Sequence, residues 1–302
     1  MRKLSVLGPV LLLLGLLWPA SSSAQTYRVG LQAGHWRSSE FPDELKSLRG
    51  NTGAAAGGVT EVQVNLDVTQ RAAGNLRGMG VAVDVLPATV PINYRADAFV
   101  AIHADGSASS RSTGFKISTH WREWEPGTAL VAALRSDYGA ASGLVWDGAR
   151  ITSGMRGYYA FSSGRYDHAI SNNTPGVILE MGYLTNPNDR RLMTAGVDRL
   201  ARAVANGVMR FLRSKPATGW PVPPPLPEYR ATITSASANL RSGPGSSFQI
   251  VRNVARGRTM MIAEVRGEWL RLLSFRSGNG NRWVHRDNVR MVRLSEEPPQ
   301  DS

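Results

Sequence analysis

Asp97-Ala98-Phe99-Val100-Ala101-Ile102-His103-Ala104-Asp105 is an apolar run that ends abruptly at a histidine and then turns through small and polar residues. The run lacks a helical period and is too short for a buried helix, so it predicts a strand buried on both faces. In an open α/β sheet, ligands bind just beyond the carboxyl ends of the parallel strands. His103 lies at that position.

Two other stretches share this design. Tyr27–Leu31 is a short apolar strand that leads into His35, and Gly176–Leu179 is another that leads into Glu180. Three such strands would deliver two histidines and one glutamate to the same edge of one sheet. We therefore expect a metal site at that edge.

Composition limits the possible partners. The chain has 302 residues, enough for two domains, and a formal net charge of +12. A basic surface favours anionic partners such as nucleic acid, anionic lipid or anionic wall polymer. The chain has no cysteine, so any metal site must use His, Asp or Glu.

The start of the chain indicates export. Residues 1–24 have the pattern of a signal peptide: basic Arg2-Lys3, an apolar stretch from Val6 to Trp18, and small residues before Gln25. A membrane anchor is the alternative, but the apolar run is shorter than the ~20 residues that a spanning helix needs. We expect a secreted or periplasmic, wall-associated protein without stable membrane insertion after cleavage. Export argues against nucleic acid as the partner.

Strands and helices alternate along residues 25–214. Thr60 with Gln63 three residues later predicts a capped helix, and a longer helix is predicted for residues 188–213. Residues 38–58 read as a loop, and residues 139–174 give no clear prediction. The alternation predicts an α/β fold with a mainly parallel sheet and helices on both faces.

The remainder of the chain has a different character. Residues 215–228 are a proline-rich linker, which favours an extended conformation. Residues 229–293 alternate apolar and polar residues in short runs broken by Gly and Pro, which predicts a small all-β barrel. Residues 294–302 are expected to be a frayed tail.

Four residues carry the predicted chemistry. Zinc takes imidazole and carboxylate ligands, and catalytic zinc sites use three protein ligands. His35, Glu61 and His103 could form such a set, with Glu61 as the first residue of the capped helix. Glu180 would then transfer protons beside the metal. Taken singly, each residue could instead be structural.

The order of four motifs resembles the zinc-dependent N-acetylmuramoyl-L-alanine amidases of the amidase_3 type, which cleave bacterial cell-wall peptidoglycan. The motifs are Gly34-His35, Glu61–Asn65, Ala101–Asp105 and Leu179–Asn186. The resemblance implies a six-stranded α/β fold, zinc bound by His35, Glu61 and His103, and Glu180 as the catalytic base.

The chain departs from that family in two places. The family usually has Asp-Pro-Gly-His-Gly-Gly at the first ligand, whereas this chain has Gln32-Ala33-Gly34-His35-Trp36. The stretch between Leu86 and Asp97 is also shorter than usual. The first departure leaves the support of His35 open, and the second implies a differently shaped groove.

The C-terminal residues resemble the bacterial SH3 family. The matching segments are Ala238–Gly245, Gly267–Leu270 and Trp283–His285. Arg282 stands where that family usually has Gly. Such domains commonly bind wall peptide or glycan, and a spacer that binds nothing is the alternative.

Together the two resemblances imply a secreted zinc hydrolase that cleaves the amide between N-acetylmuramic acid and L-alanine. The C-terminal domain would target it to peptidoglycan, its expected partner. One alternative is a non-catalytic wall-binding protein on an amidase scaffold. Another is a zinc peptidase of different amide specificity, because a fold does not determine the substrate. The sequence does not predict the oligomeric state.

Overall fold

The computed structural model describes residues 27–122, 124–273 and 282–299, and the predicted signal peptide lies outside them. The N-terminal unit is built on a five-stranded sheet with the order β4-β1-β5-β7-β6. Its strands are β1 (Arg28–Ala33), β4 (Ala82–Leu86), β5 (Ala98–Asp105), β6 (Lys116–Ser118) and β7 (Gly176–Tyr183). All neighbouring strands are parallel except β6, which runs antiparallel to β7.

The predicted class, a mainly parallel α/β sheet, is confirmed. The sheet differs in strand number from the family resemblance, because the described residues form five strands and not six. β5 and β7 lie in the interior of the sheet and are buried along nearly their whole length. This burial explains why their sequences are continuously apolar and not alternating.

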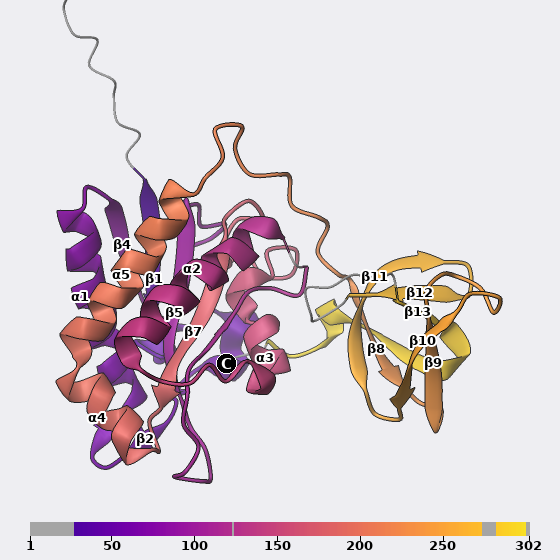
Figure 1. Ribbon diagram of the computed structural model, residues 1–302, viewed down its shortest axis with the longest axis horizontal. Coiled ribbons are helices and arrows are strands. Elements are labelled where there is room, and N and C mark those ends of the chain that lie inside the picture. The colour runs from indigo at the N-terminus through magenta and orange to yellow at the C-terminus, as the bar shows by residue number, and fades with distance from the viewer. Residues whose placement is uncertain (1–26, 123, 274–281, 300–302) are drawn as a thin grey trace, which may run out of the picture.

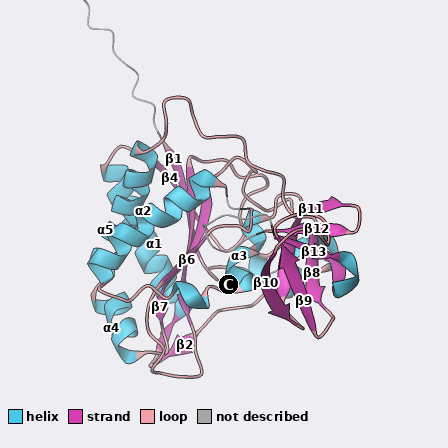
Figure 2. Cartoon of the chain, turned by 45° about the vertical axis from the view of Figure 1, so that its right-hand side comes forward, coloured by secondary structure: helices cyan, strands magenta, loops and turns pink. Residues whose placement is uncertain are grey.

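The two faces of the sheet are covered differently (Figures 1 and 2). The three long helices, α1 (Glu61–Gly78), α2 (Glu125–Ser142) and α5 (Val197–Arg213), share one apolar cluster with one face. The other face packs against short helices and loops, including η2 (Asp43–Leu48), α3 (Ser153–Arg156) and η4 (Tyr159–Phe161). Helices were expected on both faces, but the long ones all lie on one.

Helix boundaries follow local chemistry. Thr60 and Gln63 form the predicted capping box, in which each side chain bonds the other's backbone N–H. The single helix predicted for residues 188–213 is wrong: the chain forms α4 (Pro187–Ala195) and then α5, with Gly196 between them. A β-carbon at Gly196 would lie 2.6 Å from the Leu192 carbonyl oxygen, so the tight turn between the helices requires glycine.

Short elements occupy the regions that were predicted as loop or left without a prediction. Within residues 38–60 the chain forms η1 (Ser38–Glu40), η2 and a small hairpin of β2 (Ala55–Ala56) and β3 (Val59–Thr60). Within residues 139–174 it forms η3 (Gly148–Arg150), α3 and η4. Both regions bury large side chains in the second apolar cluster, among them Leu45, Tyr158 and Phe161.

The C-terminal unit is all-β, as predicted. Its seven antiparallel strands have the order β10-β9-β13-β12-β11-β8-β14, and side chains from six of them meet in one apolar cluster. The strands are β8 (Tyr229–Ile233), β9 (Ser237–Arg241), β10 (Ile250–Ala255), β11 (Thr259–Arg266), β12 (Trp269–Leu272), β13 (Arg282–His285) and β14 (Val289–Arg293), with η5 (Arg286–Asn288) before β14 and η6 (Leu294–Glu296) after it.

The segments flanking this unit make specific contacts. In the linker, Trp220 stacks on Phe211 of α5 with ring centroids 5.5 Å apart, and the Trp124 indole N–H donates to the Pro221 carbonyl at 2.8 Å. In the tail, Glu297 forms an ion pair of 2.5 Å with Arg230. The first half of the linker is therefore held against the N-terminal unit, and the beginning of the tail is held against β8.

No helix in the described residues is long and apolar enough to cross a membrane.

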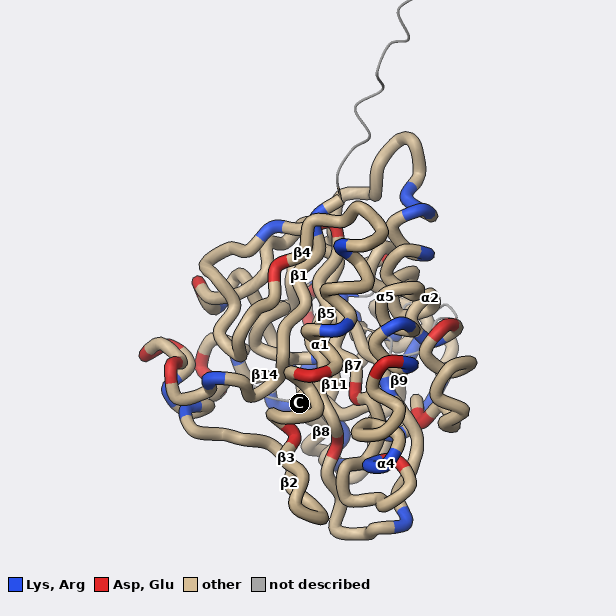
Figure 3. Tube along the Cα trace, turned by 90° about the vertical axis from the view of Figure 1, so that its left-hand side faces the viewer, with Lys and Arg blue, Asp and Glu red and all other residues tan. Residues whose placement is uncertain are grey.

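Seen from the side of β4 and α1, Lys and Arg positions are interspersed with Asp and Glu positions (Figure 3).

Candidate metal centre

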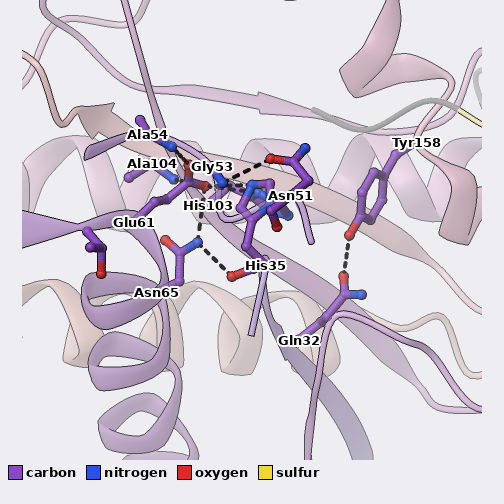
Figure 4. Close-up of polar contacts among 12 residues, drawn as sticks. Gln32, His35, Asn51, Gly53, Ala54, Glu61, Asn65, His103, Ala104 and Tyr158 are labelled. Atoms are coloured by element: carbon purple, nitrogen blue, oxygen red, sulfur yellow. Dashed lines mark hydrogen bonds and ion pairs between the residues drawn. The ribbon is translucent and has the colours of Figure 1, made fainter. Parts of the chain in front are cut away.

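Glu61 is the first residue of α1 and the hub of the site (Figure 4). Its backbone N–H donates to the Ala54 carbonyl at 2.8 Å, and its Oε2 accepts from the Ala54 N–H at 2.7 Å. Gly53 has φ +69°, and a β-carbon there would overlap the Glu61 carboxylate. The loop before the helix thus closes tightly on one carboxylate oxygen and leaves Oε1 directed toward the sheet.

Two histidines converge on Glu61 Oε1. His35 Nε2 and His103 Nδ1 each lie 3.2 Å from that oxygen. The two rings are 4.9 Å apart and nearly perpendicular. All three side chains are buried, and their ligand atoms lie within 4.8 Å of one another. The predicted set of His35, Glu61 and His103 is therefore brought together in space.

The immediate surroundings hold these side chains in place. The Asn65 amide N–H₂ donates to Glu61 Oε1 and to the Gly34 carbonyl, both at 3.1 Å. The Ala104 N–H donates to Glu61 Oε1 at 3.2 Å. His35 Nδ1 lies 3.1 Å from the Asn51 carbonyl oxygen, so a proton on Nδ1 leaves Nε2 as the ligand atom. His35 adopts φ +62°, an uncommon conformation for a residue other than Gly.

Charge at the site favours an ionised carboxylate. Burial raises the pKa of Glu61, but hydrogen bonds to His103 and His35 outweigh burial and hold the pKa far below its ordinary value. One carboxylate oxygen and two imidazole nitrogens that converge in a buried position are the donor set typical of a catalytic zinc site. The residues present therefore fit a zinc ion.

Glu180 lies next to this cluster but outside it. On β7 it is in register with His103 of β5 and with Lys116 of β6, so the three side chains leave the same face of the sheet on neighbouring strands. Glu180 is 3 % exposed. Lys116 is equally buried, bonds Asp105 through its ammonium group and lies 5.3 Å from the Tyr183 ring centre.

Comparison with known families places this site in context. Residues 29–210, more than half of the chain, match the model of the N-acetylmuramoyl-L-alanine amidases. The chain belongs to this amidase family. Residues 236–290 match the bacterial SH3 domain. The chain is thus a peptidoglycan amidase with a C-terminal SH3 domain.

Several solved structures resemble the amidase domain. AmiC2 of Nostoc punctiforme is 20 % identical, with 62 % of this chain and 97 % of that chain covered and a TM-score of 0.45. Ami1 of Mycobacterium smegmatis is 21 % identical, and the match covers 63 % of this chain and 98 % of that chain with a TM-score of 0.45. Ami1 of Mycobacterium abscessus is 23 % identical, and the match covers 62 % of this chain and 98 % of that chain with a TM-score of 0.44. No curated protein matches the chain.

The residue three positions before His35 is anchored in a way that the sequence did not reveal. Gln32, where the family usually has Asp, is fully buried. Its amide donates to the Ala88 carbonyl at 2.6 Å and to the Tyr159 hydroxyl at 3.0 Å, and its Oε1 accepts from the Tyr158 hydroxyl at 2.8 Å. Arg37, at the second of the usual Gly positions, keeps a glycine-like φ of +61°.

Residues 139–174, which the sequence left without a prediction, reach the cluster of His35, Glu61 and His103. The Tyr158 ring packs edge-on against His103 with centroids 5.6 Å apart. Gly34 also comes so close to His103 that a β-carbon there would overlap the imidazole ring. Gly34 and Tyr158 thus both restrict the position of the His103 ring.

The sequence also missed the supporting asparagines. Asn65 follows Glu61 by four residues and therefore lies on the same face of α1, a spacing that could have identified it. Asn51 acts through its backbone carbonyl from an irregular loop, and no residue pattern predicts such a contact.

The three other histidines lie away from the cluster. His168 bonds Glu44 at 2.7 Å, and His285 packs against Trp269 in the SH3 domain. His120 lines a cavity of about 820 Å³ between the two domains. Burial, reinforced by the nearby Arg122, lowers the pKa of His120 to about 3.

His120 should make the amidase domain acid-sensitive. The folded state keeps His120 neutral, whereas the unfolded chain binds a proton below about pH 6.5. The stabilisation that comes from neutral His120 is therefore complete above that pH and is lost as the pH falls from 6.5 toward 3, by up to about 5 kcal/mol. We expect His120→Asn, which keeps an acceptor for the Arg122 N–H, to flatten this part of the stability curve.

Calorimetric unfolding of the full chain between pH 7 and pH 4 would measure this slope. His285→Asn is the matched control, because His285 accepts the Asp287 N–H in the same way but is one-third exposed. Parallel curves for wild type and His120→Asn would contradict the prediction.

Proposed function

We propose that this amidase is an exported, zinc-dependent hydrolase that cleaves the amide between the lactyl group of N-acetylmuramic acid and L-alanine. The observation that carries the proposal is the convergence of His35 Nε2 and His103 Nδ1 on Glu61 Oε1. Glu180 lies in register with His103 on the neighbouring strand. This position supports a role for Glu180 in proton transfer beside the proposed metal.

The proposed roles of the residues follow from their chemistry. His35, Glu61 and His103 would hold the zinc ion. When bound, zinc would act as a Lewis acid toward the amide carbonyl and toward water. Glu180 would accept a proton from the attacking water and donate it to the leaving amine nitrogen of L-alanine. The C–N bond breaks, and a lactyl carboxylate and a free α-amino group are the products.

The surroundings of Glu180 support a role in proton transfer. Burial disfavours the charged form of a carboxylate, while Lys116 supplies a cation on the adjacent strand. Lys116 is also held by Asp105, so its position is defined. We infer that Glu180 acts beside the site and not as a metal ligand, since the side chains that could hold a metal are those of His35, Glu61 and His103.

Product analysis tests the proposed bond. Purified peptidoglycan is digested with the zinc-loaded protein, and the products are identified by mass spectrometry. We expect glycan strands with unsubstituted lactyl groups and stem peptides that begin with free L-alanine. Cleavage at another amide would indicate a zinc peptidase of different specificity, and binding without cleavage would indicate a non-catalytic scaffold.

The SH3 domain is proposed to act in targeting and not in chemistry, since all four proposed site residues precede it. A chain that ends after Val222 keeps the contacts of Trp220 and Pro221 with the amidase domain. It should hydrolyse a soluble muramyl peptide at close to the full rate. On intact wall its rate of hydrolysis should be about tenfold or more below that of the full chain, because tethering raises the local concentration of substrate.

Pelleting with insoluble peptidoglycan and parallel rate assays would measure both effects. Equal pelleting of the two forms would make the SH3 domain a spacer. An equal loss of rate on soluble and insoluble substrate would mean that the domain helps to build the active site.

A further inference from the structure

Positive charge is concentrated in the SH3 domain. Residues 229–293 contain twelve arginines, no lysine and only three acidic residues: Glu264, Glu268 and Asp287. The formal net charge of the whole chain is +12. Most of the excess charge of the protein therefore belongs to this small domain, which suggests that its ligand is anionic.

The acidic residues of the domain neutralise only a few of these arginines. Glu264 accepts hydrogen bonds from Arg266 at 2.7 Å and from Arg271 at 2.8 Å. Asp287 pairs with His285, and within the described residues it forms no ion pair with an arginine. Within the described part of the chain, Arg252, Arg258 and Arg282 form no ion pair with a carboxylate.

These three arginines line one hollow, which has a volume of about 40 Å³. Arg252 comes from β10, Arg258 from the turn before β11, and Arg282 from the start of β13. Buried apolar side chains, including Leu240 and Met260, line the same hollow. The volume is a few times the ~10–15 Å³ that one water molecule needs, so it suits the oxygen atoms of a small anionic group.

The electrostatics of the hollow favour an anion. Three like charges around one hollow repel one another. A bound anion would relieve it. Guanidinium groups also present a planar fork of N–H donors that matches a carboxylate better than a point charge does.

We propose that the hollow formed by Arg252, Arg258 and Arg282 binds a carboxylate of the peptidoglycan stem peptides. The proposal rests on the wall-targeting role proposed above and adds the site and the ligand group. Arg282 stands where the resemblance to the bacterial SH3 family leads one to expect Gly. The third arginine of the hollow is therefore a departure of this chain from that family's usual pattern.

Sedimentation with insoluble peptidoglycan, freed of phosphate-containing polymers, tests the proposal. The full chain is incubated briefly on ice, and the wall concentration that binds half of the protein is measured. We expect the triple variant Arg252→Gln/Arg258→Gln/Arg282→Gln to need at least about tenfold more wall, since hydrogen bonds between charged groups are lost. Amidation of the wall carboxylates should weaken wild-type binding to the same extent.

A matched control separates this site from general charge. The variant Arg256→Gln/Arg286→Gln/Arg290→Gln loses the same charge from the same domain at exposed positions that do not line the hollow. It should bind nearly as well as wild type. Arg252 is exposed on the edge strand β10, so Arg252→Gln alone does not disturb the core. This single variant should still need at least about threefold more wall to bind half of the protein.

Three results would overturn the proposal: equal losses in the two triple variants, unchanged binding to amidated wall, or binding that requires the phosphate-containing polymers. Hydrolysis of a soluble muramyl peptide by the same proteins reports on the metal centre independently. Its absence in wild type would count against the proposed activity, while the binding results would still decide the proposed site.

Discussion

Replacement of Glu180 with Gln is expected to lower the turnover by about 10²–10⁴-fold, the usual contribution of a general acid–base group. Gln has nearly the same shape and fits the same buried position on β7, but its amide does not accept a proton from water. The zinc content and the melting temperature should stay close to those of wild type, because Glu180 lies beside the cluster of His35, Glu61 and His103 and is not part of it.

Rates on a soluble muramyl peptide, together with elemental analysis of the purified variant, would measure this effect. Glu44→Gln is a suitable control, since Glu44 is a hydrogen-bonded glutamate of the same domain that contacts His168 and not the cluster. A Glu180→Gln variant with a near-normal rate would mean that another carboxylate transfers the proton. A variant without zinc would mean that Glu180 helps to hold the metal.

The second large effect is expected for His103→Ala. This change removes one of the three proposed protein ligands, and the loss of zinc affinity should exceed the ~10–100-fold that is typical when a supporting residue outside the ligand set is lost. Activity should fall with the metal content. A chelator should abolish the activity of wild type, and added zinc should restore it.

His168→Ala provides the comparison for His103→Ala. His168 also pairs with a glutamate, at 2.7 Å from Glu44, yet that pair lies outside the cluster. Metal content per chain, measured by elemental analysis, should stay at the wild-type value in His168→Ala and fall in His103→Ala. Full activity in a preparation without bound metal would refute the proposed zinc dependence.

Much of the candidate site was predictable because it depends on patterns that are local in sequence. An apolar run that ends in a polar residue identifies a buried strand and places His103 and Glu180 in the carboxyl-terminal halves of β5 and β7, although β7 continues past Glu180 to Tyr183. Thr60 and Gln63 identify the start of α1, and therefore the position of Glu61, because a capping box needs only residues three apart. Parallel strands then bring these ends to the same edge of the sheet.

The supporting contacts were not predictable, because they join residues that are far apart in the chain. Tyr158 bonds Gln32 across 126 positions and packs against His103, yet no periodicity marks residues 139–174. The Asn51 carbonyl bonds His35 from an irregular loop. Backbone atoms of irregular segments leave no trace in the residue types, so only the folded chain identifies such partners.

Two further features also differ from the prediction. Residues 188–213 carry one continuous apolar pattern, yet the chain turns at Gly196, where a β-carbon would meet the Leu192 carbonyl oxygen. The proline-rich linker was predicted as a spacer, but Trp220 finds a stacking partner in Phe211. By itself, the sequence indicated the buried strands, the capped start of α1 and the proposed metal ligands, since the strand and cap patterns depend on neighbours a few positions away. The tertiary structure decided which face carries the long helices, which residues pack against His103 and which arginines share one hollow, because those depend on side chains that meet only after the chain has folded.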